Sequence, residues 1–161
     1  MAQRVFTQSF AVVGAIIEKN GSILLVKEGW ESHDKGKWNQ PAGWIDPGTE
    51  PLQAIKNEVK EETGYIFEPK ALLGIYSLVK PERAGQVEGL PHAIKLIFLG
   101  DISGNASADG KEITEVKWFR PEEIFSMSGS VLRDMDIKQE VKDYFAGRAY
   151  PLEIIRHTIN S

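Results

Sequence analysis

The sequence predicts an α/β fold in which a mixed β-sheet lies between helices. Two β-rich runs, residues 9–18 and 22–28, flank Asn20-Gly21, a dipeptide typical of tight hairpin turns. A helix is predicted over about residues 50–63, because apolar side chains recur there at helical spacing. Further strand-like and helix-like segments follow. The predicted helices are numerous enough to cover both faces of a sheet.

A polar loop and an extended segment connect the hairpin to this helix. Residues 29–36 form the polar loop, and residues 38–45 form the extended segment. Thr49 suits the N-cap of the helix, and Gly64 is placed to end it.

The second half of the chain contains three more predicted strands and two more predicted helices. The strands lie near residues 70–80, 92–101 and 114–119. A short helix begins at Pro121, and a longer one covers residues 131–145. The longer helix has one apolar face, formed by Ile137, Val141 and Phe145.

Composition predicts one soluble domain that spans residues 1–161. Hydrophobic residues make up 42% of the 161 residues and charged residues 26%, the balance of a folded globular protein. The chain has no cysteine, which excludes disulfides, thiol catalysis and zinc thiolate sites. No membrane-length apolar run or secretory leader pattern is present, so we expect a cytoplasmic protein without a membrane partner.

The net charge of −4 argues against a nucleic-acid partner, which would need a basic surface. A small anionic substrate remains compatible with this charge if cations bridge it to the protein. The sequence is compatible with either a monomer or a homodimer.

The predicted helix over residues 50–63 carries an acidic face. Glu58, Glu61 and Glu62 are spaced i, i+3 and i+4, which places them on one side of a helix. Like charges at this spacing destabilise a helix unless a cation lies nearby. Carboxylate oxygens are the ligands that Mg²⁺ and Mn²⁺ prefer. The spacing therefore predicts a divalent-metal site for phosphate chemistry.

A solvated acidic surface is the alternative interpretation of this face. Lys56 and Lys60 would have to relieve its charge through i, i+4 pairs. Both lysines fall on the far side of the helix, which favours the metal site.

Residues 43–65, GWIDPGTEPLQAIKNEVKEETGY, resemble the signature of the Nudix hydrolases, G-x5-E-x7-R-E-U-x-E-E-x-G-U, where U is a bulky apolar residue. The resemblance implies an α/β/α sandwich with a central mixed β-sheet. It also implies that Glu58, Glu61 and Glu62 hold one or more divalent cations, Mg²⁺ or Mn²⁺, with the backbone carbonyl of Gly43 as a further ligand.

Two residues depart from that signature. Thr49 stands where the family has its first glutamate, and Asn57 stands where it has an arginine. These two positions normally form an ion pair, so the joint change leaves a neutral pair that could still hydrogen-bond. A neutral contact orients Glu58 less firmly than a charged one.

The resemblance extends to residues 38–43 and 150–155, which are similar to segments of a phosphatase branch of the family. It implies a metal-dependent hydrolase that cleaves phosphoanhydride bonds of nucleoside tri- and diphosphates or related organic diphosphates. One alternative is pyrophosphohydrolysis of ADP-ribose or dinucleoside polyphosphates. A second alternative is a ligand-sensing Nudix module without catalysis, which the departures at Thr49 and Asn57 favour and the intact glutamates oppose.

Candidate residues for catalysis and substrate binding follow from these interpretations. We assign catalytic roles to Glu58, Glu61 and Glu112. The base varies across the family between the helix and a later loop, so Glu58 competes for that role with Glu112 and Glu115. The substrate-binding candidates are Trp44 for a base or apolar tail, and Arg83 and Lys37 for phosphate oxygens.

Overall fold

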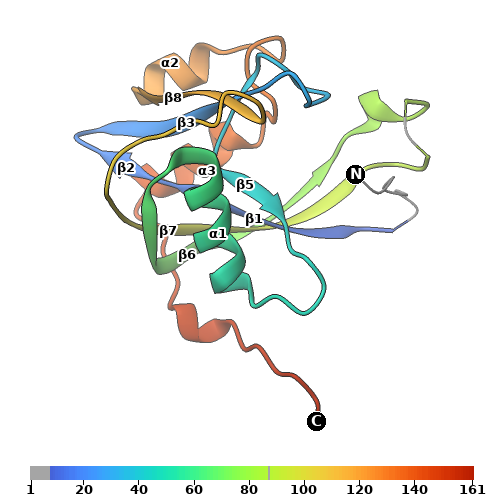
Figure 1. Cartoon of the computed structure of the whole chain (residues 1–161), viewed down its shortest axis with the longest axis vertical. Coiled ribbons are helices and arrows are strands. Elements are labelled where there is room, and N and C mark those ends of the chain that lie inside the picture. Colours follow the sequence, from blue (N-terminus) through green and yellow to red (C-terminus); the bar gives the residue numbers. More distant parts are fainter. Residues whose placement is uncertain (1–7, 87) are drawn as a thin grey trace.

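The described residues form two β-sheets of four strands each, and the larger one, which has the longer strands, is mixed and has the strand order β5-β1-β7-β6 (Figure 1). The computed structural model describes residues 8–86 and 88–161 of the chain. Strand β1 (Phe10–Ile16) runs parallel to β7 (His92–Ser103) in the centre. Strands β5 (Ala42–Trp44) and β6 (Ile66–Val79) are antiparallel to these neighbours and form the edges.

The second sheet is antiparallel. Strand β3 (Ser22–Glu28) pairs with β2 (Glu18–Lys19), with β4 (Trp38–Asn39) and with β8 (Ile113–Phe119). The turn between β2 and β3 is the predicted Asn20-Gly21, where both residues have positive φ, 52° and 80°. Positive φ at both positions matches the right-handed twist of a hairpin, so this prediction is confirmed.

Helices cover both faces of the larger sheet. Helix α1 (Pro51–Thr63) contacts β1, β5 and β6, whereas α3 (Ile137–Phe145) contacts β1 and β6. Alternate residues of β1 belong to two different hydrophobic clusters, because successive strand residues point to opposite faces. Val13 packs in the cluster that includes α1 residues, and Ile16 packs in the cluster that includes α3 residues. The predicted α/β/α sandwich with a central mixed sheet is confirmed.

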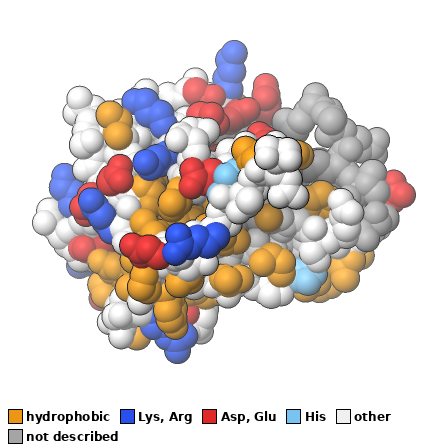
Figure 2. All heavy atoms as spheres, turned by 90° about the horizontal axis from the view of Figure 1, so that it is seen from below, with side chains coloured by type: hydrophobic (Ala, Val, Ile, Leu, Met, Phe, Trp, Pro, Cys, Tyr) orange, Lys and Arg blue, Asp and Glu red, His pale blue; other side chains and the backbone are white. Residues whose placement is uncertain are grey.

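The remaining elements are short. Helix α2 (Pro121–Ser126) follows β8, and single 3₁₀ turns form η1 (Pro81–Arg83) and η2 (Leu152–Ile154). No helix in the described ranges is both long and apolar enough to cross a membrane. Figure 2 shows one face of the molecule, on which hydrophobic side chains lie between acidic and basic ones.

The helix predicted over residues 131–145 begins six residues later than expected, at Ile137. Residues 131–133 are instead bound to β4: the amide of Trp38 donates to the carbonyl of Val131 at 2.8 Å, and the amide of Arg133 donates to the carbonyl of Trp38 at 2.8 Å. Pairing with a neighbouring strand thus overrides the local helical pattern. Phe145, predicted on the apolar face, is 50% exposed.

The predicted N-cap of α1 is also wrong. Glu50 occupies that position with extended backbone, and no side chain caps the helix. Pro51 at the first helical position lacks an amide hydrogen, so this end of the helix has one unsatisfied donor fewer. Gly64 ends the helix as predicted, in the left-handed conformation with φ 79°.

Candidate active site

Gly43 and Glu58 lie in direct contact where β5 passes the middle of α1. A Cβ atom added to Gly43 would overlap the carboxylate of Glu58. Only glycine leaves room for the carboxylate beside the backbone of residue 43. The fold thus brings two of the predicted metal-ligating residues together.

Glu62 faces the same segment one turn further along α1. Its Oε2 accepts a hydrogen bond from the amide of Ala42 at 3.0 Å. Burial raises the pKa of the Glu62 carboxyl well above its usual range, and the nearby carboxylates of Glu58 and Glu28 raise it further, against opposing effects of the Ala42 amide and Arg133. Negative charge is therefore crowded and poorly solvated here, the electrostatic condition that a bound cation relieves.

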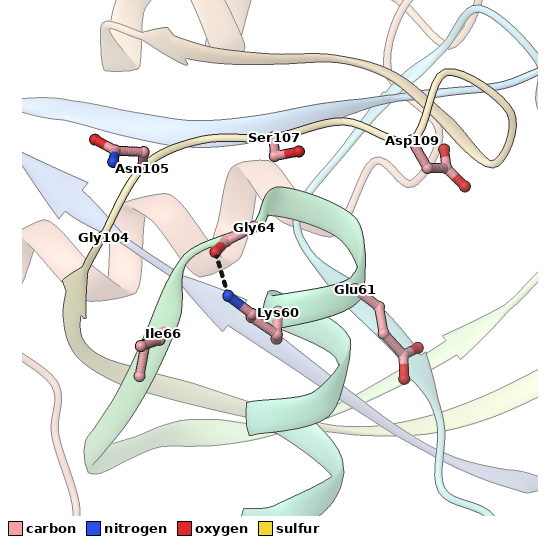
Figure 3. A pocket seen from close by; sticks show the side chains of 8 residues that line it. All are labelled: Lys60, Glu61, Gly64, Ile66, Gly104, Asn105, Ser107 and Asp109. Carbon is pink, nitrogen blue, oxygen red and sulfur yellow. Dashed lines mark hydrogen bonds between the residues drawn. The ribbon is translucent and has the colours of Figure 1, made fainter.

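Glu61 is more exposed than Glu58 and Glu62. It is exposed and lines a cavity of about 460 Å³ at the C-terminal end of α1. Figure 3 shows Glu61 on α1 and Asp109 on the loop between β7 and β8, both toward the same end of the group of lining residues. The other lining residues are Lys60, Gly64, Ile66, Gly104, Asn105 and Ser107.

The donor set fits a hard divalent cation that shares its coordination with a substrate. Across residues 8–86 and 88–161, no three His, Cys, Asp or Glu side chains form a ready metal-binding group. Mg²⁺ usually takes one or two carboxylates and completes its shell with water and substrate phosphates. Glu58 and Glu62, placed against the backbone of Ala42 and Gly43, supply two carboxylates of that kind.

The departures from the signature do not form the neutral pair considered above. The side chain of Asn57 accepts a hydrogen bond from Gln53 Nε2 at 2.8 Å, one turn back on α1. In the described part of the chain no hydrogen bond joins Asn57 to Thr49. The amide of Thr49 instead donates to the carbonyl of Asp46 at 3.0 Å. An i, i+4 contact on the helix surface thus replaces a link between helix and loop.

The loop that leads to Glu112 is anchored to the end of α1. The amide of Ser107 donates to the carbonyl of Thr63 at 2.7 Å, and a Cβ on Gly64 would come within 2.7 Å of the Ser107 nitrogen. Glu112 is exposed and does not line the cavity beside Glu61. Glu115 pairs with Lys27 at 3.0 Å. The structure therefore brings neither Glu112 nor Glu115 to the cavity.

Asp109 is the acidic residue of this loop that reaches the cavity, and the sequence did not single it out. Its Oδ1 accepts hydrogen bonds from the amides of Lys111 at 2.9 Å and Ile113 at 3.1 Å. Those amides, Ile113 first, lower the pKa of Asp109 below its usual range. The Asp109-Gly110 dipeptide, a common turn sequence, was the available signal.

The three predicted substrate-binding residues have protein partners. Trp44 is half-buried and packs edge-to-face with Phe10, with ring centroids 4.6 Å apart. Arg83 and Lys37 both form ion pairs with Asp34, which is 5% exposed. The structure thus places the two cations together at one carboxylate and Trp44 on the strand that contains Gly43.

Two charged residues near the site could not be found from the sequence. Arg133 Nη1 donates to the Oε1 atom of buried Glu28 at 2.8 Å, a contact between residues 105 positions apart. The same Glu28 oxygen accepts from Asn39 Nδ2 at 3.5 Å. No periodicity connects residues so far apart in the chain, so only the fold reveals this pair.

Comparisons with known proteins agree with this architecture. The family model described as NUDIX domain matches residues 7–141. The ADP-ribose pyrophosphatase of Methanocaldococcus jannaschii is 31% identical over 141 residues, 88% of this chain and 76% of the relative. Phosphatase NudJ of Escherichia coli (strain K12), from the phosphatase branch indicated by residues 38–43 and 150–155, is 28% identical over 143 residues, 89% of this chain and 88% of the relative.

A solved structure extends this similarity to three dimensions. The NUDIX hydrolase from Nitrosomonas europaea superposes with a TM-score of 0.79 at 32% identity and covers 94% of this chain and 98% of its own. The chain therefore belongs to the Nudix family and is a hydrolase that acts on phosphoanhydride bonds.

Proposed function

We propose that this protein is a metal-dependent phosphatase that cleaves phosphoanhydride bonds of nucleoside tri- and diphosphates or related organic diphosphates. The observation that carries the proposal is the contact of Glu58 and Glu62 with the backbone of Ala42 and Gly43. The similarity to NudJ, a phosphatase, supports the same substrate class.

The residues of the chain have separate tasks in this proposal. Glu58 and Glu62, with the carbonyl of Gly43, hold the cation, and Glu61 completes the acidic site from the side of the cavity. Bound Mg²⁺ or Mn²⁺ supplies positive charge to the diphosphate oxygens. Glu58, Glu61 and Glu112 are the candidates to accept the proton of the attacking water. Trp44, Arg83 and Lys37 contact the rest of the substrate.

A panel of substrates tests the proposal. Nucleoside di- and triphosphates, ADP-ribose, a thiamine-pathway diphosphate and prenyl diphosphates are incubated with Mg²⁺ or Mn²⁺, and all products are identified. Release of orthophosphate is expected. Binding without turnover of any compound would contradict the proposal and favour a ligand-sensing module.

Pyrophosphohydrolysis of ADP-ribose is the second candidate, because the relative from Methanocaldococcus jannaschii is an ADP-ribose pyrophosphatase. The same panel separates the two reactions. AMP together with a phosphorylated partner, and no orthophosphate, would favour this candidate.

Glu61→Gln tests the acidic site directly. Replacing a carboxylate by a neutral amide is expected to lower kcat by about 100-fold or more at saturating substrate and Mg²⁺, a loss typical of removing one charged group from a catalytic site. Glu122→Gln on exposed α2 is the matched control. Undiminished turnover of the Glu61→Gln protein would exclude Glu61 from the site.

A further inference from the structure

Three basic side chains surround the buried carboxylate of Asp34. Arg83 forms a short ion pair with Oδ2, Arg133 Nε lies 3.1 Å from the same oxygen, and Lys37 Nζ lies 3.8 Å from Oδ1. The three cations come from separate segments: η1, residues 131–136 and the loop before β4. We call Arg83, Arg133 and Lys37 the cation cluster.

The cation cluster can be reached from solvent, whereas Asp34 cannot. The side chains of Arg83, Arg133 and Lys37 are 20%, 29% and 32% exposed, against 5% for Asp34. An anion that arrives from outside therefore meets the cations first. Asp34 lies beneath them as an internal counter-ion.

The hydrogen-bonding capacity of Arg133 is incompletely used. Its Nε atom is buried yet donates no hydrogen bond to any described residue, because the approach of Asp34 lacks hydrogen-bond geometry. A guanidinium group binds carboxylates and phosphates through two parallel N–H donors. Nη1 is occupied by Glu28, and Nε lies 3.1 Å from Asp34 Oδ2 and 3.9 Å from Asp134 Oδ2 without a hydrogen bond to either, so an acceptor with better geometry is favoured at Nε.

The cation cluster is linked to the candidate active site through a short series of contacts. Arg133 binds Glu28, and Glu28 accepts from Asn39 of β4. Three residues further along the chain, the amide of Ala42 donates to Glu62. Strand β4 and the residues that follow it therefore connect the cation cluster to the residues proposed to hold the diphosphate.

We propose that the cation cluster is an anion-binding subsite, and that Asp34 occupies it until an anionic group of the substrate, beyond the cleaved diphosphate, displaces Asp34. This inference rests on the proposed function and specifies its substrates further: those with an additional phosphate or carboxylate gain affinity here. Asp34 acts as a selectivity element, because a substrate without such a group cannot compete with its carboxylate.

Asp34→Asn tests the subsite without turnover. The substitution removes the competing charge and keeps the side-chain size, so the metal-free variant is expected to bind inorganic phosphate about tenfold more tightly than the wild-type protein, as one charge-assisted contact implies. Isothermal titration calorimetry at constant ionic strength measures this. Asp101→Asn, an exposed position on β7 opposite Glu68, is the charge-matched control. Equal phosphate affinity in all three proteins would overturn the proposal.

Arg83→Gln provides a second test if Asp34→Asn fails to fold. Removing one of the cations is expected to raise KM for a nucleoside triphosphate about tenfold more than it raises KM for a prenyl diphosphate. An equal change in KM for both substrates would refute the subsite. The phosphate titration does not require catalytic activity. It therefore tests the subsite even if no hydrolysis is found.

Discussion

At the scale of single residues, the contact between Gly43 and Glu58 is the feature on which the candidate site depends most directly. The φ angle of Gly43 is not positive, so its backbone conformation does not require glycine. Glycine is required for reasons of space, because the Glu58 carboxylate occupies the place that a side chain of residue 43 would take. A substitution here acts on the position of a functional group more than on the fold.

Gly43→Ala is therefore expected to separate activity from stability. The added methyl group displaces the Glu58 carboxylate, and a shift of about 1 Å in a catalytic group costs roughly 100-fold in kcat. The free energy of unfolding should change by less than about 2 kcal/mol, because the end of a flexible side chain can move aside. Urea unfolding and initial rates measure the two effects.

Gly129→Ala is the control for this experiment. A Cβ at Gly129 meets no atom within 4 Å and its φ is ordinary, so neither quantity should change appreciably. A Gly43→Ala enzyme with wild-type kcat would show that Glu58 does not need its observed position.

At the scale of elements, a buried charge cluster fastens α3 to the central strand β7. Lys95 Nζ lies 2.9 Å from Asp136 Oδ2 and 2.9 Å from Glu140 Oε1, and Glu140 is fully buried. Burial raises the pKa of Glu140 to about 7, even though Lys95 opposes this shift. Burial lowers the pKa of Lys95, but Glu140 and Asp136 outweigh this effect and raise the pKa to about 12, so Lys95 stays charged near neutral pH.

The raised pKa of Glu140 predicts a pH dependence of stability. Between the ordinary value of about 4.5 and about 7, the folded protein keeps a proton on Glu140 that the unfolded chain has released. The contribution of this group to stability therefore falls as pH rises through that range. Glu140→Gln does not titrate and should lose less stability than the wild-type protein between pH 5 and pH 8.

Urea unfolding midpoints across that range check this expectation, with the exposed Glu153→Gln as a control that follows the wild-type curve. Parallel pH curves for the wild-type and Glu140→Gln proteins would show that Glu140 does not titrate abnormally.

The elements also show how far the sequence predicts the structure. Local signals located α1, its end at Gly64 and the Asn20-Gly21 turn, because helix periodicity and backbone conformation are set by neighbouring residues. The predicted start of α3 was wrong, because the backbone hydrogen bonds that join Trp38 to Val131 and Arg133 depend on the fold.

The same distinction holds for the candidate site. Spacing on one helix predicted that Glu58 and Glu62 share a face. Long-range contacts, which spacing does not reveal, position Asp109, Glu28 and Arg133. The partner of Arg83, the distant Asp34, was equally invisible in the sequence.

At the scale of the whole molecule, the hydrophobic core does not include the acidic residues of the candidate site. Two hydrophobic clusters fill the spaces on either side of the larger sheet, and neither contains Glu58, Glu61 or Glu62. Burial of this apolar surface supplies the main stabilisation. The fold should therefore persist when no metal is bound.

Removal of divalent cations tests this independence. EDTA is expected to abolish hydrolysis and leave a cooperative thermal transition, while Mg²⁺ restores hydrolysis and raises the unfolding midpoint by binding only the folded state. Differential scanning calorimetry and product release are measured on the same samples, with Ca²⁺-free buffer and added Na⁺ as the ionic-strength control. Loss of the cooperative transition in EDTA would mean that the metal is structural.

Arg133 has a consequence for attempts to redirect this enzyme to other substrates. It contacts Glu28 at the end of β3 and Asp34 in the following loop, and Asp34 in turn binds Arg83 in η1. Loop grafting, a common route to new specificity, would break this shared junction if one segment were exchanged alone. The loop after β3, the η1 region and residues 131–136 should instead be transplanted from a donor protein as a single unit.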